Sequence, residues 1–176
     1  GPGDWGRWDF KGRELTGRTI GIIGLGNIGT RVARMLQGFQ TTTLYTDVLE
    51  FPAELERELQ VTRVSIDDLL DRSDIVTVHV PLSSSTTGLM GRREFAAMKP
   101  EAFFINTCRG KVQDEEALIK ALQSGEIAGA GLDVFATEPT PADNPLRTMS
   151  NVVTTPHAAG GSTRSATLSR IRAGQN

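Results

Sequence analysis

An apolar run, a glycine turn and a helical pattern follow one another at residues 18–39, and this order constrains the fold more than any other feature. The run RTIGII (18–23) is typical of a buried strand, and GLGNIG (24–29) fits the pattern G-x-G-x-x-G. Apolar side chains then recur at the spacing of one helix face: Ile28, Val32, Met35, Leu36 and Phe39. The order predicts a strand that enters a tight turn, followed by a helix whose first N–H groups can bind a pyrophosphate.

A second match to the glycine pattern, GPGDWG, begins the chain. With 19 glycines in 176 residues the pattern arises by chance in about 0.2 windows per chain, so only its context is informative. No strand precedes GPGDWG, and Pro2 removes one N–H donor. We interpret residues 1–3 as the remnant of a cleaved purification tag and exclude them from the expected fold.

Composition places the chain among ordinary globular proteins, with 38% hydrophobic and 23% charged residues. The formal charge of −2 and the scattered basic residues support neither a nucleic-acid partner nor a membrane partner. The single cysteine, Cys108, excludes an internal disulfide and favours a reducing compartment, so we expect a cytoplasmic protein. We expect no signal segment, no membrane span and no metal site.

Strand-like and helix-like segments alternate along residues 18–160, which predicts an α/β fold with one doubly wound parallel sheet, a Rossmann domain. Most expected strands are continuous apolar runs, as in strands covered on both faces. They are Thr19–Ile23, Thr42–Thr46, Ile75–Val80, Ala102–Asn106, Ala130–Phe135 and Val152–Thr155. We expect residues 4–17 to lead into this domain and residues 161–176 to begin a segment that returns from it.

Helix signals lie between these strands. Pro52 opens the segment PAELEREL, and Ser65 and Asp68 form a capping pair around IDDLLDR. Asp114 precedes EEALIKAL, and Gly125 follows it. These signals predict repeated strand–helix–strand units.

Ligands bind beyond the carboxyl ends of the strands in open parallel sheets, so the residues after each strand are candidates for a site. Asp47 ends the second expected strand at the spacing from Gly26 where a carboxylate accepts hydrogen bonds from an adenosine ribose. Because this carboxylate would repel a 2′-phosphate, it favours NAD. The plain alternative is a solvated aspartate in a turn.

Further polar residues follow the later strands. Arg109 could bind a small carboxylate through two parallel hydrogen bonds, although most arginines only form surface ion pairs. Glu138 could be an exposed loop acid, and His157 taken alone could be structural. The chain's two histidines, His79 and His157, both fall at this edge, and the joint placement favours a catalytic site. We interpret Cys108 as a packing residue or backbone contact, since no other feature suggests covalent chemistry.

Five ordered motifs resemble the cofactor domain of the D-2-hydroxyacid dehydrogenase family: GIIGLGNIG, HVPLSSSTTGLM, FFINTCRGKVQDEEAL, GAGLDVFATEP and TTPHAAGGSTRSA. The resemblance runs from about Trp8 to about Thr167. It implies that Arg109, Glu138 and His157 are catalytic. It also implies contacts to an NAD cofactor from Gly24, Gly26, Asn27, Ile28, Gly29, Asp47, His79, Pro81, Thr86, Thr107, Cys108, Asp133 and Gly160.

The resemblance implies hydride transfer between the nicotinamide and C2 of a small 2-hydroxy or 2-keto acid. Arg109 would hold the substrate carboxylate and polarise the 2-keto oxygen, and His157 would exchange a proton with that oxygen. Glu138 would orient His157, and Asp133 would contact the nicotinamide amide. Formate dehydrogenases resemble the chain less, because they have glutamine where this chain has Glu138.

Some positions depart from the family pattern. Gln40 stands where a glycine usually ends the first helix, Thr41, Thr42 and Thr43 make the second strand polar, and Thr46 replaces a common tyrosine. Family members also build a second, substrate-binding domain from chain on both sides of this segment. We therefore interpret the sequence as a fragment, a cofactor domain that bears half of an active site.

Two other functions stay open. Corepressors that resemble this family keep the same Arg, Glu and His, so an NAD-sensing scaffold without turnover is an alternative. A methyltransferase-like nucleotide fold is disfavoured by the shared edge of Arg109, Glu138 and His157. For the enzyme and for the NAD-sensing scaffold alike, we expect a homodimer through the cofactor domain, because the cofactor domains of this family pair through their own surface.

Overall fold

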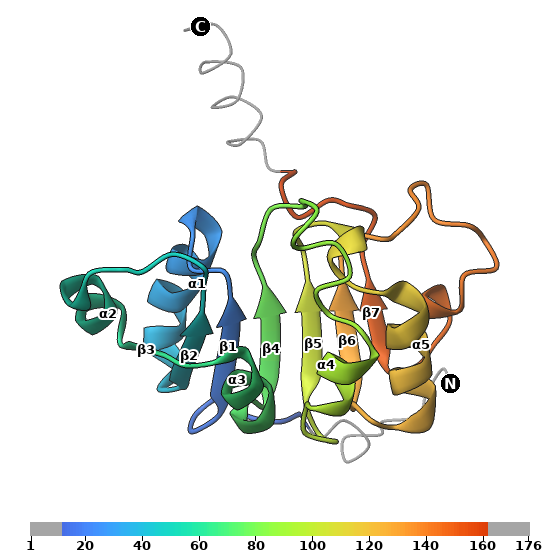
Figure 1. Ribbon diagram of the computed structural model, residues 1–176. Helices are drawn as coiled ribbons and strands as arrows, with labels where there is room; N and C mark the ends of the chain where they lie inside the picture. The colour runs from blue at the N-terminus through green and yellow to red at the C-terminus, as the bar shows by residue number, and fades with distance from the viewer. Residues whose placement is uncertain (1–11, 162–176) are drawn as a thin grey trace, which may run out of the picture.

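The computed structural model describes residues 12–161, which form one seven-stranded, all-parallel sheet with helices on both faces (Figure 1). Its strand order is β3-β2-β1-β4-β5-β6-β7, which confirms the predicted doubly wound fold. The strands are β1 (Thr19–Ile23), β2 (Thr42–Thr46), β3 (Val61–Arg63), β4 (Ile75–Val78), β5 (Phe103–Asn106), β6 (Gly129–Leu132) and β7 (Val152–Thr154). The predicted tag remnant, the glycine pattern at residues 1–6 and nearly all of the predicted return segment lie outside the described residues.

Five helices and three 3₁₀ turns connect the strands of the described part. They are α1 (Asn27–Leu36), α2 (Ala53–Leu59), α3 (Ile66–Arg72), α4 (Arg92–Ala96) and α5 (Glu115–Ser124), with η1 (Gln37–Phe39), η2 (Gly110–Val112) and η3 (Pro145–Arg147). Figure 1 shows α3, α4 and α5 in front of the sheet and α1 behind it.

The predicted helix caps are confirmed. The Ser65 hydroxyl accepts a hydrogen bond from the Asp68 N–H, and the Asp114 carboxylate accepts one from the Ala117 N–H. Gly125 ends α5 in the left-handed conformation, with φ +75°.

All six predicted strands are present, but several of their ends are wrong. The strands β4 and β6 stop at Val78 and Leu132, because the residues that follow them leave the ladder for loops at the carboxyl edge. The sequence prediction also missed β3 and α4. Each has a single buried residue, Val61 in β3 and Phe95 in α4, so neither carries a periodic pattern.

The predicted apolar face of α1 is also wrong in part. Ile28, Met35 and Phe39 are 55%, 64% and 50% exposed, whereas Gly29 and Ala33 are buried. A Cβ added to Gly29 would lie 2.1 Å from the carbonyl oxygen of Gly24. The helix packs so close to β1 that only small side chains fit, and this close approach overrides the pattern of large apolar residues.

The core lies on both faces of the sheet. The larger cluster includes Phe95 and Phe104, whose rings pack edge to face with centroids 5.2 Å apart. The smaller cluster gathers around Tyr45 and Leu59. None of the helices among residues 12–161 is both long enough and apolar enough to cross a membrane.

Candidate functional site

The glycine turn between β1 and α1 has the shape that a phosphate requires. Gly24 has φ +94°, and a Cβ there would lie 2.7 Å from the carbonyl oxygen of His79, so a side chain is excluded on both grounds. At Gly26 the Cβ position is open, with no heavy atom of the described chain within 4 Å. No side chain caps α1 at Gly26 in the described structure, and its first turn contains no acidic residue. The first N–H groups of α1 are therefore available to an anion.

Asp47 joins the end of β2 to this turn. Its Oδ2 accepts a hydrogen bond from the Leu25 N–H at 2.7 Å, and its Oδ1 accepts one from the Leu49 N–H at 2.8 Å. The fixed carboxylate keeps lone pairs that can accept ribose hydroxyls. The structure also brings Arg63 of β3 to this place, which the sequence prediction missed. Arg63 donates to the Asp47 carbonyl oxygen at 3.0 Å.

The residues after β4 border the glycine turn, since β4 pairs with β1. The His79 side chain is half-buried beside the Thr77 hydroxyl, with Nε2 and Oγ1 3.0 Å apart, and burial lowers the pKa of His79. The Thr86 hydroxyl donates to the Pro81 carbonyl oxygen at 2.6 Å and accepts from the Ser83 N–H. These contacts shape the loop that follows β4.

The loop after β5 is organised by Asn106, a fully buried residue that was not among the predicted site residues. Its Oδ1 accepts a hydrogen bond from the Cys108 N–H at 2.9 Å, and its amide donates to the Arg109 carbonyl oxygen at 3.0 Å. Thr107 and Arg109 are exposed, and the Arg109 guanidinium donates to the Cys108 carbonyl oxygen at 2.6 Å. Burial raises the pKa of the Cys108 thiol, which supports its interpretation as a packing residue.

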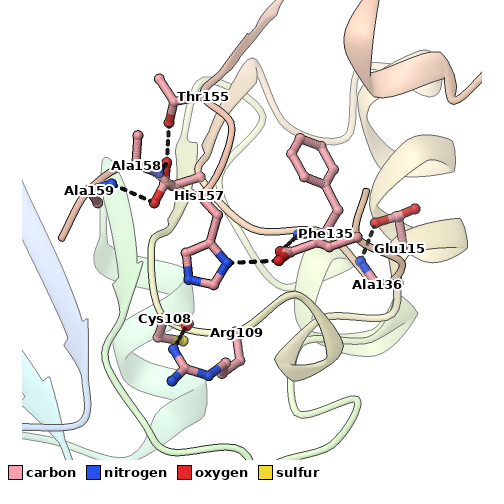
Figure 2. Close-up of polar contacts among 11 residues, drawn as sticks. Cys108, Arg109, Glu115, Phe135, Ala136, Thr155, His157, Ala158 and Ala159 are labelled. Carbon is pink, nitrogen blue, oxygen red and sulfur yellow. Dashed lines mark hydrogen bonds and ion pairs between the residues drawn. The ribbon is translucent and has the colours of Figure 1, made fainter. Parts of the chain in front are cut away.

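Asp133 follows β6 and holds the chain that carries His157. Its carboxylate accepts hydrogen bonds from the Thr155 hydroxyl and from the N–H groups of Ala158 and Ala159 at 2.8 and 2.9 Å (Figure 2). Burial acts to raise the pKa of the Asp133 carboxyl, but these hydrogen bonds outweigh it and hold the pKa below its ordinary value. The Asp133 carbonyl oxygen also accepts from the His157 N–H at 2.8 Å.

His157 and Glu138 form the central pair of the site. Imidazole Nδ1 lies 2.7 Å from Oε2 of Glu138, and Oε1 of Glu138 accepts from the Phe135 N–H at 2.9 Å. The hydrogen bond with His157, and then that from Phe135, lower the pKa of Glu138, so the carboxylate stays ionised. Because Nδ1 is occupied by Glu138, Nε2 is the ring nitrogen that can exchange a proton with a substrate. His157 has φ +53°, a left-handed conformation that the Asp133 contacts hold in place.

Arg109 reaches the same region from the neighbouring loop. Figure 2 shows its guanidinium on the same side of the site as the His157 ring, below it in this view. A cavity of about 630 Å³ has Glu138, His157 and Arg147 in its walls, but among residues 12–161 its lining does not include Arg109. The three predicted catalytic residues thus meet at one edge without being enclosed in one pocket by the described chain. Their roles, and those of the predicted cofactor contacts, stay predictions.

Known proteins are similar to this chain along almost its whole length. Residues 2–159 match the family model described as D-isomer specific 2-hydroxyacid dehydrogenase, NAD binding domain. The chain is 47% identical over 158 residues to a glyoxylate reductase of Korarchaeum cryptofilum, covering 90% of this chain and 47% of that protein. It is 43% identical over 166 residues to a D-3-phosphoglycerate dehydrogenase of Archaeoglobus fulgidus, covering 94% of this chain and 31% of that protein.

A solved structure has the same fold. The crystal structure of D-lactate dehydrogenase with NAD⁺ from Lactobacillus jensenii superposes with a TM-score of 0.83 at 37% identity. The match covers 89% of this chain and 50% of that one. The chain therefore spans about half the length, or less, of these proteins.

Proposed function

Because the chain belongs to the D-isomer specific 2-hydroxyacid dehydrogenase family, as its NAD-binding domain, we propose that the protein transfers hydride between NAD and C2 of a small 2-hydroxy or 2-keto acid. The observation that carries this proposal is the 2.7 Å contact of Glu138 with His157 at the edge of the sheet that also holds the open glycine turn. Two of the similar proteins are a glyoxylate reductase and a D-lactate dehydrogenase, whose names specify acids of this class.

The residues present fit the cofactor. The N–H groups at Asn27 and Ile28 would hold the pyrophosphate, where the Gly26 Cβ position is open. Asp47 would accept the hydroxyls of the adenosine ribose. Bound NAD supplies the hydride or accepts it.

The protein's own residues would handle the substrate and the proton. Arg109 would bind the substrate carboxylate and polarise the 2-keto oxygen. His157 would donate its Nε2 proton to that oxygen during reduction and accept it during oxidation. The ionised Glu138 would keep the ring in this orientation and stabilise its positive charge whenever the ring is protonated.

The test is turnover of NADH by the full-length protein with glyoxylate, pyruvate and hydroxypyruvate. The proposal expects oxidation of NADH with at least one of these acids. NAD-dependent oligomerisation without turnover would instead support the scaffold alternative, although the proteins compared above are named as enzymes.

The division of labour within the full-length protein is a second part of the proposal. Residues 18–160 would form the cofactor domain, and chain on both sides of it would form a domain that closes over the substrate. The 176-residue chain should therefore bind NADH without oxidising it, because a substrate displaced by about 1 Å can already react about 10²-fold more slowly. Robust turnover by this chain would contradict the division.

We further propose a two-fold homodimer through the cofactor domain, in the cytoplasm. The family resemblance supports the dimer, and the lone Cys108 fits a reducing compartment. A strictly monomeric mass by light scattering at high concentration would contradict the dimer.

A further inference from the structure

The loop of residues 136–144 carries Glu138 into the site, and its own backbone contributes the bond from the Asn144 N–H to the Pro141 carbonyl oxygen. It leaves the sheet after β6 and ends at η3, and most of its residues are exposed. The Glu138 carboxylate reaches His157 only if this loop has a defined position, because the contact spans 19 positions of the chain. Contacts from outside the loop to its two ends would help to set that position.

Glu115 contacts both ends of the loop. Its Oε2 accepts a hydrogen bond from the Ala136 N–H at 2.8 Å, as Figure 2 shows, and its Oε1 accepts one from the Asn144 side-chain amide at 2.8 Å. The Glu115 side chain is half-buried and lies in the first turn of α5, where a negative charge is favourable. One carboxylate thus joins the start and the end of the loop to a helix.

The same helix follows the loop that carries Arg109. The 3₁₀ turn η2 leads from Arg109 to the start of α5, and it packs directly on the chain after β6. A Cβ added to Gly110 would lie 1.9 Å from the carbonyl oxygen of Phe135, so the two segments are in backbone contact. Glu115 therefore lies where it can fix the Glu138 loop relative to Arg109.

We infer that Glu115 is a positioning residue: through Ala136 and Asn144 it holds the loop that places Glu138 on Nδ1 of His157. The effect of Glu115 on catalysis rests on the proposed function, but its effect on the position of the Glu138 loop does not. Glu115 touches neither His157 nor Arg109 in the hydrogen bonds described above, and it acts through the loop.

Glu115→Gln is a sharp test because it replaces only one carboxylate oxygen, by an NH₂ group. Both partners of the carboxylate are donors, so glutamine can accept from one of them and must turn its own NH₂ toward the other. Asn144 cannot relieve this clash by turning its amide over, because its Oδ1 caps η3 by accepting from the Leu146 N–H at 3.0 Å. The variant should therefore release one end of the loop.

The neighbouring residue offers a matched control. Glu116 lies in the same helical turn, is exposed, and pairs with Lys120 on the surface. Glu116→Gln removes the same charge from the same turn without touching the loop. A second variant, Asn144→Asp, keeps a side-chain oxygen to cap η3 but replaces the donor to Glu115 by a carboxylate.

The readout is the ring of His157, observed by NMR of the 176-residue chain labelled with ¹⁵N-histidine. The chain has only two histidines, so His79 serves as an internal reference for the fold. At about pH 9 the bond to Glu138 should keep a proton on Nδ1 of His157. Glu115→Gln and Asn144→Asp should lower this Nδ1–H population at least about twofold, whereas Glu116→Gln and the His79 signals should not change.

Three results would overturn the inference. They are an unchanged Nδ1–H population in Glu115→Gln and Asn144→Asp, an equal loss in Glu116→Gln, or a loss in Glu115→Gln that Asn144→Asp does not share. Should Glu115→Gln alter the His79 signals as well, Asn144→Asp alone decides. In the full-length protein, Glu115→Gln should lower kcat and leave the KM for NADH unchanged. Absence of turnover in the unaltered full-length protein would contradict the proposed function, while the NMR result would still decide the positioning.

Discussion

The two sides of the site are built in opposite ways. Beside β1 and β2, the site combines the Asp47 carboxylate with backbone N–H groups and open space, as at Gly26, whose Cβ position has no neighbour within 4 Å in the described chain. Beside β6 and β7, it consists of side chains that are already hydrogen-bonded, as at Asp133, which is 3% exposed. The first side presents N–H groups that are open to a ligand, whereas the second side presents side chains that already bind one another.

This difference separates two kinds of effect. Changes on the glycine side should alter cofactor affinity with little effect on stability, as long as the new atoms enter the open space. Changes at Glu138 and His157 on the Asp133 side should alter stability or catalysis with little effect on cofactor affinity, whereas Asp133 itself is also a predicted contact to the nicotinamide amide.

The largest effect is expected for His157→Ala in the full-length protein. Loss of the residue that exchanges the proton should lower kcat about 10²- to 10⁴-fold. The dissociation constant for NADH, measured by fluorescence titration, should stay within about twofold, because His157 lies on the side that does not hold the pyrophosphate. A parallel loss of NADH affinity would break the separation.

Asp133→Asn should destabilise the domain by about 2–3 kcal/mol at neutral pH, because it weakens hydrogen bonds to a buried charge. The folded-state pKa of Asp133 lies below its ordinary value, so the extra stability is present above about pH 4 and is lost as the pH falls through the folded-state pKa. Urea denaturation should show a difference in the free energy of unfolding between the unaltered chain and Asp133→Asn, and this difference should be smaller at about pH 3 than at about pH 7. A difference in unfolding free energy that does not depend on pH would show that the hydrogen bonds do not favour the charged form of Asp133.

On the glycine side, Gly26→Ala should raise the dissociation constant for NADH about tenfold and leave the melting temperature nearly unchanged. The matched variant Gly29→Ala should lower the melting temperature, because its Cβ would lie 2.1 Å from the Gly24 carbonyl oxygen. Calorimetric melting and NADH titration of both variants give the comparison. Equal melting temperatures for the two variants would contradict the packing described for α1.

The smallest effect is expected for Gln40→Gly, away from both sides of the site. Gln40 ends η1 in the left-handed conformation, with φ +56°, which suits glycine better. The substitution should stabilise the domain by about 1 kcal/mol and raise the melting temperature by about 2–4 °C. Gln40→Ala should give no such gain, because alanine keeps the strain, and an equal gain would contradict the explanation.

The part of the fold that depends on neighbours in sequence could be predicted. The strand, turn and helix at residues 18–36 and the caps at Ser65 and Asp114 all rest on local geometry, and the structure confirms them. The face that α1 buries could not be predicted, because it depends on how close the helix lies to β1. The strand β3 could not be predicted either, since three residues carry no period.

The residues of the site also divide into those that the local sequence predicts and those that it does not. The spacing between the glycines and Asp47 is local enough to point to a cofactor. The organising role of Asp133 depends on hydrogen bonds that only the tertiary structure brings together, with residues 22 to 26 positions away. Asn106 bonds to residues two and three positions away, but no sequence pattern shows that its side chain turns back onto its own loop. Arg63 belongs to this second group, because the missed strand β3 delivers it to Asp47.

Calorimetric titration of the 176-residue chain with NADH and then NADPH tests whether the glycine turn and Asp47 form an NAD site. Because the Asp47 carboxylate accepts ribose hydroxyls and repels a 2′-phosphate, NADH should bind one molecule per chain, at least about tenfold more tightly than NADPH. Equal or reversed affinities would contradict the role given to Asp47 in choosing between the cofactors. Absence of NADH binding would contradict an NAD site at the glycine turn.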